Sequence, residues 1–312
     1  SLNDKNPWSI GTAKFVVYYT ADNYNDYEMI PIPINVPTNV NTAFSGQSLA
    51  SFITSSSANI DDAFALGAFE SLPGYSFAFV LDISSRSVKT IKPYLEYATS
   101  AICGVNKDLA YMAAYRTSTN FAAILTLQKS SNSDVYGHTT YNVSNITSFV
   151  NDIYFKQNGE VGIFLGDAKS GTWGIGYTSN SGATWNLIPN PISAQTNETG
   201  LVGASDFDGQ NNVWFGSSNG KVYHSSDFGQ NWNFTQASQN QIVKVAFIDN
   251  NNGMAMYSTT AGVRGLVSTT DGGQTWTVVK DNLINIGLNP IKIFADSKVN
   301  SYVIVNYDGA LY

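Results

Sequence analysis

Short apolar runs separated by polar turn residues recur along the chain. Between Ile242 and Asp281 they read IVKVAFIDNNNG, GMAMYST, VRGLVSTT and TWTVVKD. Runs of this kind, rich in β-branched and aromatic residues and bounded by Gly, Asn and Asp, predict β-strands, which we name A to D. No segment keeps a helical apolar period over a length sufficient for a helix. The pattern therefore predicts an all-β protein.

The turn between strands C and D carries a motif that occurs three times. Thr178–Trp185 reads TSNSGATW, Ser225–Trp232 reads SSDFGQNW and Thr269–Trp276 reads TTDGGQTW. The shared spacing is a hydroxyl, any residue, Asp or Asn, any residue, Gly, any residue, Thr or Asn, and Trp. The tryptophans are 47 and 44 residues apart, a period typical of the four-stranded blades of propellers.

Further copies of the same pattern occur earlier in the chain, and the earliest of them is weaker. SFVNDIYF, VGIFLGD and TWGIGYT supply strands A to C before the first motif, and TSAICGVNKD, LAYMAAYRT and FAAILTLQ supply an earlier set. SFAFVLDISSRSVKTI is a predicted hairpin, Thr20–Tyr27 (TADNYNDY) reads as a decayed motif, and residues 31–75 are assigned as irregular or insertion-bearing. At about 45 residues per blade, residues 1–312 are predicted to form a single β-propeller domain of seven blades, or of six if 31–75 is an insertion.

The motif resembles the Asp-box, or bacterial neuraminidase repeat (BNR repeat), of β-propellers, which is found in sialidases, sortilin-type receptors, xyloglucanases and photosystem II assembly factors. The matching residues are Thr178, Asn180, Gly182, Thr184 and Trp185 in the first copy, Ser225, Asp227, Gly229 and Trp232 in the second, and Thr269, Asp271, Gly273, Thr275 and Trp276 in the third. The resemblance implies the fold. It implies no particular function, because proteins that share the motif do unrelated things.

Each residue of the motif has a structural use. The hydroxyl and the Asp or Asn can bond backbone N–H groups of a tight turn, and Gly adopts a conformation that other residues resist. The Trp is expected to bury its ring beside the next blade. The motif is therefore interpreted as a device that stabilises the C–D turn, and Asp227 and Asp271 receive no catalytic role.

The charge of the chain argues against some partners. Only 12% of the residues are charged, the formal net charge is −7, and no basic run is present to neutralise phosphates, so nucleic acid is not an expected partner. The single cysteine, Cys103, lies in the apolar run SAICGV and is predicted to be a core residue.

No apolar run approaches the length of a membrane span.

The uncharged polar surface favours an exported protein. Four Asn-X-Ser/Thr sequons give glycosylation candidates at Asn142, Asn145, Asn197 and Asn233. We expect a secreted or cell-surface protein whose signal segment lies outside this chain.

The resemblance places ligand sites on the face made by the B–C and D–A loops. The charged residues that the alignment puts in B–C turns are the binding candidates Arg116, Asp167, Lys169, Arg264 and Asp308. Asp206–Asn211 (DFDGQN) is similar to a calcium loop but lacks the bidentate Glu. His138 and His224 are too few for a zinc site without identified carboxylates. No metal or other cofactor is expected.

Two functions of different classes remain open. A sialidase would need three convergent arginines, and the chain has only Arg86, Arg116 and Arg264. A xyloglucanase-like enzyme places its carboxylates between two propellers, and photosystem factors present an Arg-rich patch that this acidic chain lacks. The sequence therefore favours a non-catalytic binding or structural propeller that contacts a protein or a glycan. The alternative is a divergent glycoside hydrolase of sialidase-like or xyloglucanase-like architecture, which needs two carboxylates in one pocket.

The two ends of the chain are predicted to build one blade, because an open ring exposes two sheet edges. Residues 301–312 align with strands B and C of a blade, and Ser1, Asn3 and Trp8 fall at the motif positions that should follow. Residues 1–12 would then close the last blade with residues 290–312. A rival alignment makes Trp8–Gly11 a strand B that leads into KFVVYYT and the decayed motif.

Deletion of residues 1–11 is expected to destabilise the whole ring, since each blade of a repeat protein depends on its neighbours. Thermal unfolding should stay a single transition and move to a lower temperature. A truncated chain that melts at the same temperature as the intact one would contradict closure by these residues.

Overall fold

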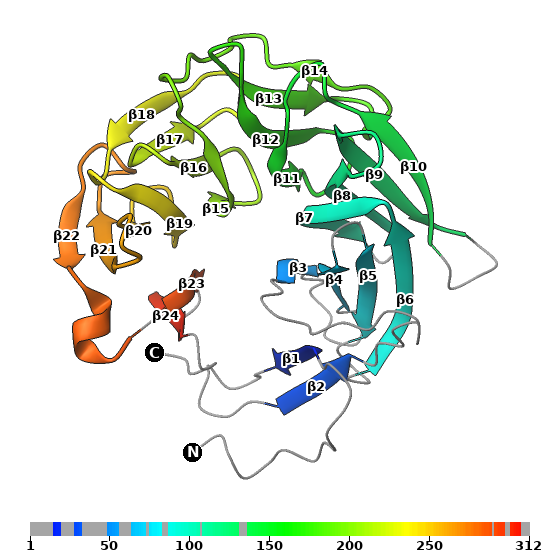
Figure 1. The fold of residues 1–312 in the computed structure, drawn as a ribbon, viewed down its shortest axis with the longest axis horizontal. Coiled ribbons are helices and arrows are strands. Elements are labelled where there is room, and N and C mark those ends of the chain that lie inside the picture. The colour runs from blue at the N-terminus through cyan, green and yellow to red at the C-terminus, as the bar shows by residue number, and fades with distance from the viewer. Residues whose placement is uncertain are drawn as a thin grey trace.

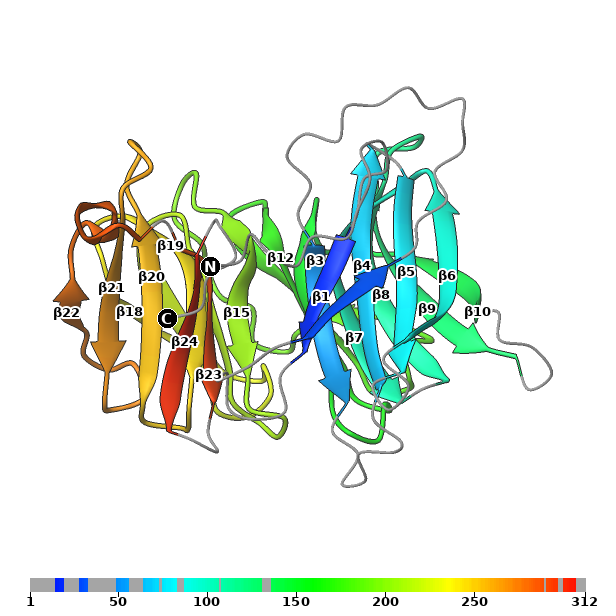
Figure 2. The same ribbon diagram turned by 90° about the horizontal axis from the view of Figure 1, so that it is seen from below.

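The computed structural model describes residues 15–19, 28–32, 49–55, 64–72, 75–82, 87–106, 108–130, 136–288, 290–296 and 300–306. Within these ranges the chain folds into antiparallel sheets arranged in a ring (Figure 1), and the only helix is the short 3-10 turn η3 (Leu283–Ile286). The strands run roughly along the axis of the ring (Figure 2). The chain is an all-β propeller, as the sequence predicts.

Five sheets have four strands each, in chain order from the inside of the ring to the outside. They are β3 (Leu49–Ser55), β4 (Phe64–Leu72), β5 (Tyr75–Asp82) and β6 (Ser87–Leu95); β7 (Tyr97–Asn106), β8 (Leu109–Arg116), β9 (Phe121–Lys129) and β10 (Tyr136–Asn142); β11 (Val150–Phe155), β12 (Gly162–Lys169), β13 (Thr172–Thr178) and β14 (Asn186–Leu187); β15 (Gly200–Phe207), β16 (Val213–Ser217), β17 (Lys221–Ser225) and β18 (Asn233–Gln236); and β19 (Gln241–Phe247), β20 (Gly253–Ser258), β21 (Arg264–Thr269) and β22 (Thr277–Lys280). The three motifs lie between the third and fourth strands of the last three of these sheets, where the alignment puts them.

Two further sheets have two strands each: β1 (Phe15–Tyr19) with β2 (Glu28–Ile32), and β23 (Pro290–Asp296) with β24 (Ser301–Asn306). β1 and β2 are antiparallel, and Tyr19 at the end of β1 pairs with Glu28 at the start of β2. They therefore lie on either side of the decayed motif, as strands C and D do around the motif in other blades. Residues 1–12 and 307–312, on which the closure prediction depends, lie outside the described residues. Closure by these residues stays a prediction.

The segment 31–75, assigned from the sequence as irregular or insertion-bearing, contains β3 and β4, the first two strands of a regular sheet. β4 pairs with β5, and β5 pairs with β6, which confirms the predicted hairpin SFAFVLDISSRSVKTI. The Ser and Thr residues of β3 (LASFITS) blur its apolar pattern. Because β-propensity depends on context, a strand of this composition is hard to recognise from the sequence.

The first strand of each blade lies nearest the centre of the ring in Figure 1, and it contacts the first strand of the next blade. In the sheets from β7 to β22, the second and third strands are mostly buried, and every residue of β16 is buried. The fourth strands β14, β18 and β22 lie at the outer rim and are largely exposed. The middle strands of these four blades therefore provide most of their apolar burial.

Aromatic clusters fill the spaces between neighbouring blades. Trp173 of β13 lies edge-on to Phe215 of β16, with ring centroids 5.0 Å apart. Trp214 of β16 stacks on Phe247 of β19 at 4.0 Å. Adjacent residues of one strand, Trp214 and Phe215, thus point to opposite faces of their sheet and contact opposite neighbours. Cys103 is buried in another such cluster, as predicted.

The hydrogen bonds of the motif stabilise the C–D turn. Ser225 Oγ accepts the N–H of Gly229 at 2.7 Å and donates to Asp227 Oδ1 at 2.8 Å. Asp227 Oδ1 also accepts the N–H of Asn231 at 2.8 Å. The same three bonds occur in the other two copies, through Thr178 and Asn180 and through Thr269 and Asp271. The hydroxyl and N–H of Thr275 lower the pKa of Asp271 to about 2.

The motif tryptophans contact the preceding blade, and the expectation that they lie beside the next blade is wrong. Trp276 Nε1 donates to Thr235 Oγ1 of β18 at 3.1 Å, and Trp232 packs into the cluster between the β11–β14 and β15–β18 blades. The physical reason is the placement of the turn: a Cβ on Gly229 would come within 2.2 Å of Ile163 in the preceding blade. The turn therefore fits closely against the preceding sheet.

The exposure of these tryptophans predicts unequal effects of substitution. Trp185 is 2% exposed, whereas Trp232 is only partly buried. Trp185→Ala is expected to lower the free energy of unfolding by about 3–5 kcal/mol, and Trp232→Ala by less, because less contact is lost. Urea unfolding of both variants measures the difference, and equal losses would contradict this packing.

Candidate functional site

Each blade presents different loops at its two edges. Because successive strands are antiparallel, the A–B and C–D turns emerge at one edge, and the B–C turns and the connections between blades emerge at the other. We call the first the motif face and the second the B–C face.

Four of the five binding candidates lie beside B–C turns. Arg116 ends β8, Asp167 and Lys169 lie at the end of β12, and Arg264 begins β21. Asp308 lies outside the described residues. The four come from three blades, and among the described residues no hydrogen bond or ion pair joins any two of them. The structure does not gather them into one site.

Three of these candidates are bonded to other segments of the chain. Arg116 donates through Nε and Nη2 to Glu96 Oε2, at 3.2 and 3.0 Å, and this contact lowers the pKa of Glu96. The Lys169 ammonium and the Arg264 guanidinium each donate to a backbone carbonyl. Burial lowers the pKa of Arg264. Each cation therefore links its B–C turn to another segment of the chain, Lys169 to Ser144 and Arg264 to Pro290.

Asp167 joins two blades. Its Oδ1 accepts from Asn151 Nδ2 at 2.8 Å and from the N–H of Gly200, the first residue of β15, at 3.1 Å. A substitution here would leave a backbone N–H between the blades without its acceptor, which is costly.

Polar side chains of the first strands form a second group, which was not predicted from the sequence. Asp152 on β11 accepts from Ser205 Oγ of β15 at 2.5 Å and from Tyr154 OH at 3.1 Å. Asp152 is 8% exposed. Burial raises the pKa of Asp152 and also that of Tyr154.

Asp206 and Lys244 extend this group to the next blade. Asp206 accepts the N–H of Phe247 on β19 at 2.6 Å and that of Phe207 at 2.9 Å. Burial raises the pKa of Asp206 to about 7. Lys244 on β19 donates to two carbonyls of β15, at 3.2 and 3.1 Å. An innermost strand has one edge without a ladder partner, and these side chains bond backbone groups along it.

A buried ion pair anchors the connection between β14 and β15. Glu198 Oε2 accepts from Lys221 Nζ at 3.2 Å, and the two side chains are 0% and 5% exposed. Ser217 Oγ and Tyr223 OH donate to the same carboxylate at 2.7 and 3.1 Å. Because every charged atom has partners, the pair serves the fold; removing one partner alone would leave a buried charge.

The sequence did contain a signal for part of this group. Asp152 and Lys244 each lie three residues before the Phe that ends their first strand. A charged side chain at the same place in two strands that are otherwise mostly apolar indicates a position that does not face an apolar cluster.

Two A–B turns on the motif face are closed by aspartates. Asp208 Oδ1 accepts the N–H groups of Gln210, Asn211 and Asn212 at 2.7, 2.9 and 3.0 Å, and Asp249 bonds its own turn in a similar way. The likeness of Asp206–Asn211 to a calcium loop thus reflects an ordinary turn. Within the described ranges, no three His, Cys, Asp or Glu side chains gather as a metal site would require.

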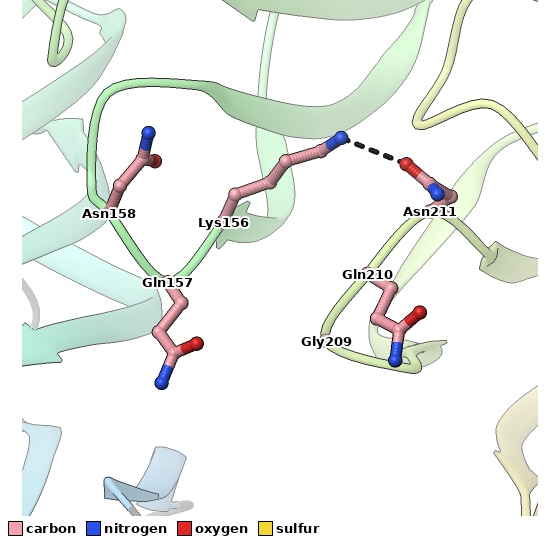
Figure 3. A pocket seen from close by; sticks show the side chains of 6 residues that line it. All are labelled: Lys156, Gln157, Asn158, Gly209, Gln210 and Asn211. Atoms are coloured by element: carbon pink, nitrogen blue, oxygen red, sulfur yellow. Dashed lines mark hydrogen bonds between the residues drawn. The ribbon is translucent and has the colours of Figure 1, made fainter.

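A shallow depression of about 530 Å³ lies on the motif face between two neighbouring A–B turns. Its lining residues are Lys156, Gln157, Asn158, Gly209, Gln210 and Asn211 (Figure 3). Lys156 Nζ donates to Asn211 Oδ1 across the gap at 2.8 Å. The depression is therefore lined by side-chain amides and one cation.

The remaining sequence candidates have surface or packing positions. The four sequon asparagines are all exposed. His224 stacks on Trp214 with centroids 4.9 Å apart and bonds Asn212, so it is a packing residue, and His138 is exposed. Nothing helical in the described part of the chain has the length and hydropathy of a membrane span.

Solved structures of low sequence identity share this fold. They include a chain of the mitotic checkpoint complex (TM-score 0.59, 11% identity, covering 96% of this chain and 83% of that one). YCF48 from Cyanidioschyzon merolae is similar (0.51, 14%, 85% and 94%), as is U3-55K (0.52, 9%, 84% and 90%). Identities this low show the fold alone. The sequence matches no protein-family model and no curated protein.

The raised pKa of Asp206 predicts a pH dependence of stability. Between its ordinary value of 3.8 and about 7, the folded state holds a proton that the unfolded state has lost, so stability falls as pH rises. One such proton contributes a slope of at most about 1.4 kcal/mol per pH unit. Asp152 acts in the same direction.

Asp206→Asn is expected to flatten this decline, because the variant cannot titrate at that position. Urea unfolding of both proteins from pH 4.5 to 7.5 at constant ionic strength gives the two slopes. Parallel curves would show that Asp206 ionises in the folded protein as it does in water.

Proposed function

We propose that the chain is a non-catalytic binding propeller of a secreted or cell-surface protein, and that it contacts a protein or a glycan through the loops of its faces. The observation that carries this proposal is the amide-lined depression between two A–B turns. Gln157 and Gln210 are exposed there, and their side chains make no hydrogen bond within the described residues. Donors and acceptors that the fold leaves unused are what a polar ligand requires.

The use of the charged side chains supports a binding role. Asp152 and Asp206 bond groups of neighbouring strands, and Glu198 is buried against Lys221. Arg116 and Arg264, two of the three arginines that a sialidase site would need, are bound within their own surroundings. Carboxylates that accept structural hydrogen bonds are poorly placed to act as general acid and base.

The repeated hydrogen bonds of the three motifs support kinship with Asp-box propellers. The hydroxyl, the Asp or Asn, and the Gly make the same three contacts in each copy. We propose this kinship as structural, because the motif stabilises a turn and carries no ligand-binding group of its own. The exposed sequons support the proposal of an extracellular location.

A divergent glycoside hydrolase is the second candidate, and one observation favours it. Asp152 and Asp206 both have raised pKa values, and carboxylates of raised pKa serve as general acids in glycosidases. Their hydrogen bonds to Ser205 and to the N–H of Phe247 give these carboxylates a structural role as well.

Two measurements on the intact chain decide between the candidates. Calorimetric titration with neutral oligosaccharides, acidic oligosaccharides and extended peptides is expected to detect binding. An assay for new reducing ends is expected to detect none. Release of reducing ends that Asp152→Asn or Asp206→Asn abolishes would establish the hydrolase, and failure of every probe to bind would contradict the binding role.

A further inference from the structure

The depression on the motif face has a defined construction. One side is the turn after β11, which carries Lys156, Gln157 and Asn158, and the other is the turn after β15, which carries Gln210 and Asn211. In Figure 3 the Lys156 side chain spans the gap toward Asn211, whereas Gln157 and Gln210 project from the tips of the two turns. The site is thus made by two adjacent blades.

The charge of Lys156 has no carboxylate partner. This lysine is partly buried, its ammonium bonds the Asn211 amide and lies 5.0 Å from the Phe228 ring, and within the described residues it forms no ion pair. Arg116 and Lys221 each bond a glutamate, whereas Lys169 and Arg264, like Lys156, bond neutral oxygens. No carboxylate lines the depression. A cation held in this way has donors available for an anion, and charge-assisted hydrogen bonds are stronger than neutral ones.

The amides around Lys156 indicate what else the ligand carries. Each carboxamide presents a donor and an acceptor side by side, and a vicinal pair of hydroxyls offers the complementary pattern. Gln157 and Gln210 are exposed, and no hydrogen bond within the described residues uses their side chains. The lining contains no apolar side chain, so the depression fits a hydrated ligand better than an apolar one.

We infer that this depression binds a saccharide that carries a carboxylate, such as a uronic acid unit. The carboxylate accepts from Lys156 Nζ, and the ring hydroxyls bond the amides of Gln157 and Gln210. The inference rests on the proposed binding function and names the ligand class for one face. It places the site on the motif face, away from the B–C face where the sequence analysis placed the binding candidates.

A matched pair of probes tests the carboxylate. Oligogalacturonate and its carboxyl-reduced counterpart differ only at that group, so calorimetric titration of the intact chain isolates its contribution. The acidic probe is expected to bind about tenfold more tightly or better, the ratio that one charge-assisted hydrogen bond supplies. The advantage should shrink as salt is added. Equal affinities for the two probes would overturn the inference.

A matched set of variants tests the position. Lys156→Gln is expected to abolish the preference for the acidic probe, and Gln157→Glu and Gln210→Glu, each made singly, are expected to weaken its binding by repulsion. Gln239→Glu makes the same charge change at an exposed residue on the other edge of the ring and should leave binding unchanged. Melting temperatures show whether each variant folds. If Lys156→Gln does not fold, the variants at the exposed Gln157 and Gln210 still test the site.

The outcomes separate this inference from the proposed function. Acidic-probe binding that none of the depression variants alters overturns the site while leaving a binding propeller. Failure of both saccharides, with binding of a peptide probe, overturns the ligand class and leaves the propeller a protein-binding module. Failure of every probe contradicts both.

Discussion

Burial of both faces of each blade against its neighbours is the constraint on which the structure depends. A four-stranded sheet whose middle strands are apolar on both faces is unstable alone in water, because both apolar faces would be exposed to solvent. In the ring, Trp214 faces one neighbour and Phe215, the next residue, faces the other. Each sheet therefore needs a sheet on either side, and many aromatic side chains of the described residues lie where these sheets meet.

A second consequence of the ring concerns its polar groups. The first strands have an inner edge with unpaired backbone groups, and the chain bonds some of them with side chains such as Asp167, Asp206 and Lys244. The chain has few charged residues. Because several of the described ones bond backbone groups in this way, few of them are available to a ligand. What is left at the surface is mainly neutral amide and hydroxyl chemistry, with Lys156 as a charge that lacks a carboxylate partner.

Much of the fold could be predicted from the sequence, and the reasons are local. The motif fixes the C–D turn through contacts within eight residues, so its spacing identifies Ser225–Trp232 and the other copies directly. The side of the sheet on which Trp232 packs depends on how two blades pack together. The sequence of a single repeat does not indicate that packing. β3 was not predicted because Ser and Thr residues interrupt its apolar pattern.

The candidate site was harder to predict for the same reason. The sequence places Arg116, Asp167, Lys169 and Arg264 correctly beside B–C turns, but their partners come from other strands, and those partners decide what the charges do. The depression between Gln157 and Gln210 exists only because two turns more than fifty residues apart lie side by side. No property of either turn alone indicates it.

The contact of each motif with the preceding blade gives the ring a direction. Trp276 bonds Thr235, and the turn at Gly229 fits against Ile163, so in both cases the later part of the chain packs onto the earlier part. Domains generally fold from the N-terminus during synthesis. A blade that leaves the ribosome therefore meets its packing partner already made, and the ring can grow by successive addition without waiting for the rest of the chain.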